Sequence, residues 1–401
     1  MLIKSEGKNK SLDIIEYSKN KFKDFFQEPI NEVDALILAQ LTYFDFQGIV
    51  GGLEEKKEWR SVASLYKAEN FSFMTSKIIQ SEFNLELFAA LCASPRYRDI
   101  IVNFYVEKHS VDEEEQFAAI TFKLPTGEIV VAYRGTDTTM IGWKEDFNMT
   151  FLSPVPSQLS AADYLQQVAD KTSENIYIVG HSKGGNLAVY GAAHSATSIQ
   201  DRINAIYNFD GPGFSKEFLE SDDYGYVGNK IIKFIPEGSI VGMLLENSGN
   251  INFVQSSGLG VLQHIAFSWK IANDKFQKTE NNSGIAKKID RDIDAWVSEL
   301  DLHDRKIFID TVFSIISSAN INTLYDFTKL GLKETEVIYK AIKELKEKDE
   351  KTYFGVKEIF DKFLRISLTS KFEKSISEKT SAIEKEGSHI VGNLLEWLKK
   401  N

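Results

Sequence analysis

One serine of this sequence lies in a pattern that is typical of a catalytic nucleophile. In "NIYIVGHSKGGNLAVY", residues 175–190, Gly180, Ser182 and Gly184 form Gly-x-Ser-x-Gly between an apolar run and a stretch that favours a helix. Such a corner needs small flanking residues, and it leaves the serine Oγ free above the sheet. The helix N-terminus beneath it favours developing negative charge. The pattern predicts that Ser182 is a nucleophile, and a plain tight turn is the alternative.

Acyl transfer through a serine also needs two N–H donors for the oxyanion of the tetrahedral intermediate. One is expected from Lys183, the residue after the nucleophile. The other is expected from Thr136 in "VVAYRGTDTTMIGWKEDFNM", residues 130–149, because it follows an earlier strand and carries both an N–H and a hydroxyl. A simple strand exit with a structural Arg134 is the alternative for this segment.

The predicted general base is His264, one of six histidines in the chain. It follows the last expected strand of the sheet and comes after Ser182, in agreement with the order serine, acid, histidine. His181 is adjacent to the serine. Neighbouring residues at such a corner point in opposite directions, so we expect His181 to be structural.

Two acidic residues between Ser182 and His264 end expected strands. Asp210 ends "AIYNFD" and enters the turn "GPGF", whereas Glu237 ends "KIIKFIPE". The position after the later strand favours Glu237, but aspartate is the shorter and more rigid side chain, and Asp210 lies on a turn fixed by Gly and Pro. We therefore prefer Asp210 as the acid, with Glu237 as the alternative.

The elements that must position these residues follow from the hydrophobic pattern. β-rich runs separated by turn residues predict antiparallel hairpins, and strands that alternate with helices then predict a largely parallel α/β sheet. The expected strands are 100–109, 116–124, 129–135, 175–180, 205–210, 230–237 and 251–257, and the expected helices are 31–45, 83–94, 161–174 and 186–197.

The chain changes character near residue 285, where it becomes helical and rich in Lys and Glu. We predict an α/β domain over 1–285 and an α-helical C-terminal region over 286–401. The last segment, 387–401, places apolar residues on one helical face. Packing on preceding helices is the expected role of this face, and binding to a membrane surface is the alternative.

Composition excludes several classes of protein. The net charge of −11 argues against nucleic acid as a partner. No signal peptide and no run of 18 apolar residues is visible, so a soluble, cytoplasmic protein is expected unless a non-standard export route carries it. The single cysteine, Cys92, is expected to be a buried small apolar side chain. Zinc-ligand spacing is absent, and the predicted chemistry needs neither metal nor cofactor.

These segments together resemble the α/β-hydrolases of the class 3 lipase type. "VVAYRGTD", "GWKEDFNM" and "IVGHSKGGNLA" resemble that family's oxyanion segment, its following Trp/Asp segment and its elbow. Blocks such as "NFDGPGF" and "QHIAFSW" resemble more specifically a bacterial branch of lipase-like proteins of unknown function. The resemblance covers about residues 30–275, and the helical tail also resembles the region C-terminal to the hydrolase domain in that branch.

The resemblance implies Ser182 as nucleophile, His264 as base, and Thr136 with Lys183 as oxyanion donors. The acid departs from the family pattern, because Ser239 stands where the family has an Asp. This departure makes Asp210, or Glu237, the replacement. Lys183 is a second departure, since an uncharged residue is common there. Its cation could favour an anionic acyl group or simply extend away from the site.

The expected function is therefore that of a serine hydrolase of the lipase or esterase type. It would cleave a carboxylic ester, either a lipid or a small acyl ester, through an acyl-enzyme. A thioester is a further possible substrate. The alternative is a hydrolase-fold binding module with little or no activity that acts through its helical C-terminal region.

Overall fold

The computed structural model describes most of the first 280 residues and two long helices beyond them. The described residues are 11–55, 57–78, 80–137, 140–149, 152–239, 241–257, 260–280, 302–319, 332–348, 352–353 and 356–357. The chain divides into two compact units, one of residues 1–137 and 141–299 and the other of residues 138–140 and 300–401.

The first unit is built on an eight-stranded sheet whose strands lie side by side in chain order. Strands β1 to β4 are antiparallel, and β4 to β8 are parallel. The strands are β1 (Arg60–Ser61), β2 (Ile101–Ser110), β3 (Glu115–Lys123), β4 (Ile129–Tyr133), β5 (Ile176–His181), β6 (Ile203–Phe209), β7 (Ile231–Pro236) and β8 (Asn250–Val254). This is an α/β-hydrolase fold, as the sequence predicts.

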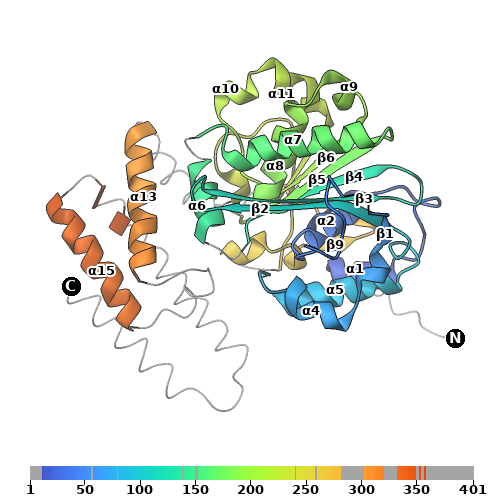
Figure 1. Ribbon diagram of the computed structural model, residues 1–401, viewed down its shortest axis with the longest axis horizontal. Helices are drawn as coiled ribbons and strands as arrows, with labels where there is room; N and C mark the ends of the chain where they lie inside the picture. Colours follow the sequence, from blue (N-terminus) through green and yellow to red (C-terminus); the bar gives the residue numbers. More distant parts are fainter. Residues whose placement is uncertain are drawn as a thin grey trace, which may run out of the picture. The chain divides into compact units, whose positions relative to one another are not determined.

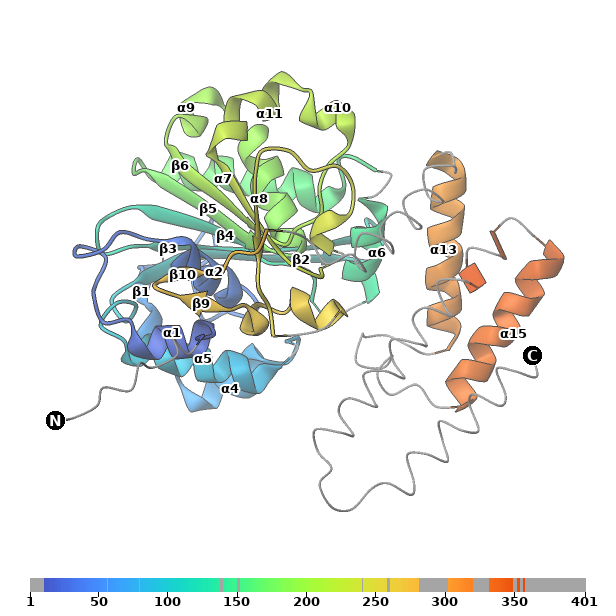
Figure 2. The ribbon, with the colours of Figure 1, turned by 180° about the vertical axis from the view of Figure 1, so that it is seen from behind.

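The central strands are mostly apolar and largely buried, in agreement with helices that cover both faces of the sheet. Figures 1 and 2 show α7 and α8 on one face and α1, α2 and α5 on the other. Their bounds are α1 (Ile14–Asn20), α2 (Glu32–Leu41), α5 (Ser81–Ala93), α7 (Pro156–Lys171) and α8 (Lys183–Ala193). Both layers are thus needed to keep the parallel strands out of water.

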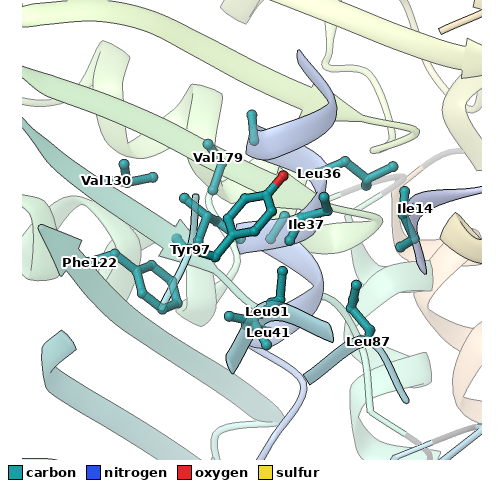
Figure 3. Close-up of a cluster of buried hydrophobic side chains, with 14 of the residues drawn as sticks. Ile14, Leu36, Ile37, Leu41, Leu87, Leu91, Tyr97, Phe122, Val130 and Val179 are labelled. Atoms are coloured by element: carbon teal, nitrogen blue, oxygen red, sulfur yellow. The ribbon is translucent and has the colours of Figure 1, made fainter. Parts of the chain in front are cut away.

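Successive strand residues alternate between the two cores. On β4, Val130 and Ala132 pack in the core that contains α2, whereas Val131 and Tyr133 pack in the core that contains α7 and α8. Figure 3 shows the first of these cores, where Leu36, Ile37 and Leu41 of α2 meet side chains of the sheet and of α5. The period of two follows from the pleat of the strand.

Helix α2 begins where the sequence predicts. The Asn31 side chain accepts hydrogen bonds from the backbone N–H groups of Val33 and Asp34, and the Asp34 side chain accepts one from the Asn31 N–H. This reciprocal cap satisfies donors that have no partner inside the helix. The cap fixes the start of α2. Tyr43 lies two positions beyond the end of this helix.

Shorter elements complete the first unit, and two long helices are described in the second. The shorter elements are α3 (Val62–Leu65), α4 (Ala68–Met74), α6 (Met140–Asn148), α9 (Thr197–Gln200), α10 (Lys216–Leu219), α11 (Asp222–Val227), the 3₁₀ turns η1 (Gly228–Lys230), η2 (Val241–Met243), η3 (Gly260–His264) and η4 (Ala266–Ser268), and a separate pair, β9 (Ile271–Ala272) and β10 (Lys275–Phe276). The second unit contains α13 (Leu302–Ser318) and α15 (Leu332–Lys348).

The two described helices of the second unit agree with the predicted helical character. The predicted boundary between 285 and 286 falls in 281–301, and the amphipathic segment 387–401 falls at the end of the chain; both lie outside the described residues. The domain limits and the role of that segment therefore stay predictions. Among the described residues, no helix combines the length and the apolar character that crossing a membrane requires.

Candidate active site

Ser182 occupies the sharp turn between β5 and α8. Its backbone angles are φ 59° and ψ −135°, a conformation that L-residues rarely adopt. The Ser182 N–H donates to the Phe209 carbonyl at 2.9 Å, and the Ser182 carbonyl accepts from the Gly185 N–H at 2.8 Å. The surrounding backbone thus holds the strained residue in place. Strain that is maintained in this way is a feature of functional sites.

The two glycines of the motif are required by close backbone packing. A Cβ added at Gly180 would lie 2.0 Å from the carbonyl oxygen of Gly184, and a Cβ at Gly184 would lie 2.2 Å from that of Tyr133. Neither position has room for a side chain. The glycines therefore allow helix α8 to start directly above β4 and β5, with Ser182 at its N-terminus.

His264 and Asp210 are brought together at the same end of the sheet. Asp210 follows β6 with a φ of 54°, and His264 is the last residue of η3. The His264 Nδ1 lies 2.6 Å from Asp210 Oδ2, and the Asp210 side chain is completely buried. A carboxylate accepts hydrogen bonds, so Nδ1 carries the hydrogen and Nε2 is left as the ring's acceptor.

Glu237 lies after β7, where its N–H donates to the Val254 carbonyl. The acid that contacts the His264 imidazole is thus Asp210, which the sequence favoured, and not Glu237. The neighbouring Ser239 is also buried, and its Oγ donates a hydrogen bond to Asp210 Oδ2 at 2.5 Å. Ser239 stands where the class 3 lipase pattern places an Asp. Through its hydroxyl, this position contacts the Asp210 carboxylate.

The His181 side chain hydrogen-bonds to the backbone of His264. Its Nε2 lies 2.8 Å from the His264 carbonyl oxygen, its Nδ1 lies 2.9 Å from the Tyr43 hydroxyl, and the two imidazole centroids are 4.7 Å apart. Burial, together with the nearby His264, lowers the pKa of His181 to about 3. The ring is therefore neutral; Nε2–H donates to the carbonyl and Nδ1 accepts from Tyr43.

The oxyanion segment packs directly on the elbow. A Cβ at Gly135 would lie 2.6 Å from the His181 carbonyl oxygen and 3.0 Å from the Ser182 Cβ, so only glycine fits there. The next residue, Thr136, donates its hydroxyl to Asp146 Oδ2 of α6 at 2.5 Å. The hydroxyl is therefore engaged, and the group of Thr136 that remains for an oxyanion is its backbone N–H.

Asp146 is an unusual carboxylate in this part of the site. Burial raises its pKa to about 6, although the nearby Lys183 opposes the shift. Its Oδ1 is buried and has no hydrogen-bond partner within the part of the chain that the structure describes. The group therefore changes charge near neutral pH while it holds the Thr136 side chain.

The Lys183 side chain does not point toward a substrate, and it does not extend into solvent. Its Nζ contacts Glu145 Oε2 at 2.8 Å and the Gln116 carbonyl oxygen at 2.6 Å, with both charged side chains completely buried. The cation therefore extends away from the Ser182 side of the elbow, but it ends in a buried ion pair and not in solvent. Lys183 is the first residue of α8, so no preceding helical turn accepts its backbone N–H. This N–H is therefore not used within the helix.

Several residues of the site were not predicted. Tyr43 contacts His181 across 138 residues, and no local pattern marks it. Glu145 and Asp146 lie in "GWKEDFNM", which resembles the family's Trp/Asp segment, but the sequence assigned neither of them a role. For Ser239 there was a signal, because it occupies the position of the missing family acid.

Other chemistry receives less support from the described residues. Burial raises the pKa of the Cys92 thiol to about 12, which keeps it in its unreactive neutral form. Within the described residues, no group of three His, Cys, Asp or Glu side chains is arranged to hold a metal ion.

Among the solved structures that are similar to this chain are two lipases. The crystal structure of M37 lipase matches 53% of this chain and 70% of that lipase, at 16% identity and a TM-score of 0.34. Rhizomucor miehei lipase in its propeptide complex matches 51% of this chain and 76% of that chain, at 14% identity and a TM-score of 0.34. No curated protein matches the chain.

The sequence model of the Mbeg1-like family matches residues 91–314, which is more than half of the chain. The matched range includes strands β2 to β8, Thr136, Ser182, Asp210 and His264. The chain therefore belongs to the Mbeg1-like family.

Proposed function

We propose that this protein is a serine hydrolase of the lipase or esterase type, which cleaves a carboxylic ester through an acyl-enzyme. The observation that carries the proposal is the combination of a strained serine between β5 and α8 with a histidine whose Nδ1 is bound to a buried aspartate. A serine at a strained elbow and a histidine oriented by a buried carboxylate are two of the parts that a serine hydrolase requires.

In the proposed reaction, Ser182 Oγ attacks the ester carbonyl and His264 Nε2 accepts the serine proton. The backbone N–H groups of Thr136 and Lys183 donate to the oxyanion that forms. His264 then gives the proton to the leaving alcohol, and the acyl group stays on Ser182. A water molecule, activated by His264 in the same way, attacks the acyl-enzyme and releases the carboxylic acid. Asp210 holds the imidazole in the required tautomer and stabilises its protonated form.

The environment of Lys183 bears on the choice of substrate. Because its ammonium group is neutralised by Glu145 and shielded from solvent, it supplies no positive charge for an anionic acyl group. We therefore propose uncharged acyl groups, from a lipid or a small ester, as the substrates. A series of nitrophenyl esters of increasing chain length, with a thioester of equal acyl length, would define this preference.

The proposal is tested with a fluorophosphonate probe, which labels activated serines. We expect labelling of the wild-type protein and at least a hundredfold slower labelling of Ser182→Ala. Ser18→Ala is the matched control, because Ser18 is a buried serine of α1 whose hydroxyl donates to the Ile14 carbonyl oxygen in its own helix. A folded wild-type protein that is not labelled would contradict the proposal and favour a binding module.

A further inference from the structure

We infer that Ser239 is a positioning residue for the acid of the site: its hydroxyl fixes the Asp210 carboxylate in the orientation that binds His264. The inference rests on the proposed function for its catalytic consequence. The contacts on which it depends belong to the described residues and do not require that function.

The first observation is that two donors meet at one oxygen. Ser239 Oγ lies 2.5 Å from Asp210 Oδ2, and His264 Nδ1 lies 2.6 Å from the same atom. Both distances are in the range of hydrogen bonds to a charged acceptor, which are about twice as strong as neutral ones. The serine thus acts on the oxygen that orients the imidazole.

The second observation is that the other carboxylate oxygen contributes no anchor. Asp210 Oδ1 is buried and has no hydrogen-bond partner among the described residues. It lies against the backbone of η2, since a Cβ added at Gly242 would be 2.2 Å from it. Apart from the imidazole, Ser239 is therefore the side chain that hydrogen-bonds this carboxylate within the described residues, while Lys233 interacts with it through its charge.

The third observation concerns rigidity. Ser239 is completely buried, and its N–H donates to the Pro236 carbonyl oxygen at 3.0 Å, directly after β7. Asp210 is tied to the same strand, because its N–H donates to the Phe234 carbonyl oxygen at 2.8 Å. The backbones of both residues are thus hydrogen-bonded to the end of β7. This keeps the Ser239 hydroxyl close to the Asp210 carboxylate.

The consequence is a specific kinetic signature. Ser239 is buried behind the acid and does not reach a substrate, so its loss changes the chemical step and leaves binding unaffected. We expect Ser239→Ala to lower kcat about tenfold to a hundredfold, in line with the loss of one hydrogen bond to a charged group, with KM unchanged. Ser239→Thr keeps the hydroxyl, and we expect it to retain most of the wild-type kcat.

Ser18→Ala is again the matched control, since it removes an equally buried serine hydroxyl that is far from the acid in sequence and bonds within α1. Both alanine variants are expected to lose a similar amount of unfolding free energy, but only Ser239→Ala should lose activity. A wild-type kcat in folded Ser239→Ala overturns the inference.

A second measurement does not need turnover. In protein with ¹⁵N-labelled histidine, the His264 Nδ1–H proton resonance is identified by its absence in His264→Ala. We expect Ser239→Ala to make this proton exchange faster with water, and Ser239→Thr and Ser18→Ala to leave its exchange at the wild-type rate. Unchanged exchange in Ser239→Ala overturns the inference. If the wild-type protein is not labelled by the fluorophosphonate but this signal still depends on Ser239, the proposed function fails and the positioning role is retained.

Discussion

The two sides of Ser182 hold their buried carboxylates in different ways. On one side, Glu145 is paired with the ammonium group of Lys183, and both side chains are completely buried. On the other side, the hydrogen-bond partners of Asp210 are an imidazole and a serine hydroxyl, and the nearby charge of Lys233 also interacts with its carboxylate. A carboxylate that is hydrogen-bonded to a permanent cation is largely neutralised already, whereas one whose hydrogen-bond partners are uncharged is better able to stabilise an imidazolium that forms during a reaction. The comparison separates a structural ion pair from a candidate catalytic one.

The largest expected effect is the loss of activity when the contact between Asp210 and His264 is broken. Asp210→Asn is expected to lower kcat by about three to four orders of magnitude, because the amide can stabilise neither the tautomer nor the charge of His264. The unfolding free energy should change far less than the activity. Ester hydrolysis and chemical denaturation measure the two quantities. Glu237→Gln is the control and should behave as the wild type; the reverse outcome would transfer the role of the acid to Glu237.

The next largest effect is expected when the buried ion pair between Lys183 and Glu145 is broken. Lys183→Met leaves Glu145 charged and unpaired, and is expected to cost about 3–5 kcal/mol of unfolding free energy. The double variant Lys183→Met/Glu145→Leu should recover part of this loss, because neither charge of the pair is then left without its partner. Urea denaturation gives both values. Lys19→Met, which breaks an exposed pair with Glu86, is the control and should have a much smaller effect. Equal losses for Lys183→Met and Lys19→Met would contradict the comparison.

The smallest expected effect is on the pH dependence of stability and concerns Asp146. This buried carboxylate has a neutral hydrogen-bond partner, Thr136, and a nearby cation, Lys183. Its pKa is raised from 3.8 to about 6 by burial, so between these values the folded state binds more protons than the unfolded state. Stability from this group is present below about pH 4 and is lost as the pH rises through about 6. We expect the wild type to lose stability relative to Asp146→Asn over this interval. Denaturation curves at several pH values measure the difference, and a constant difference would contradict the assignment.

Local patterns predicted most of the fold. Strands β2 to β8 and helices α2, α5, α7 and α8 were located because apolar runs and turn residues are short-range signals. Strand β1 and helices α1, α4 and α6 were not predicted, and α7 begins at Pro156 and not at the expected residue 161. The limits of α8 were wrong: the helix was expected over 186–197 and spans Lys183–Ala193. Gly184 and Gly185 are poor helix formers, but the close packing of strand and helix requires residues without side chains at this turn, and this requirement outweighs propensity.

The site was predictable only in part. The Gly-x-Ser-x-Gly motif identified Ser182, and chain order with strand ends identified His264 and Asp210. The structure brings His264 and Asp210 into contact. Their catalytic roles stay predictions. The inward turn of Lys183 was not visible, because Glu145 lies on a helix that the sequence does not place relative to the elbow. The contact between Tyr43 and His181 spans 138 residues, and no periodicity encodes such a separation.

Tyr43 lies outside the range 91–314 that matches the family, as do α1, α2 and most of α5. Yet its hydroxyl bonds to the imidazole of His181, which in turn holds the backbone of His264. Removal of the residues before the matched range would take α1, α2 and most of α5 from one face of the sheet, together with the phenol that bonds His181. The backbone of His264 is therefore supported in part by a residue that lies outside the family match.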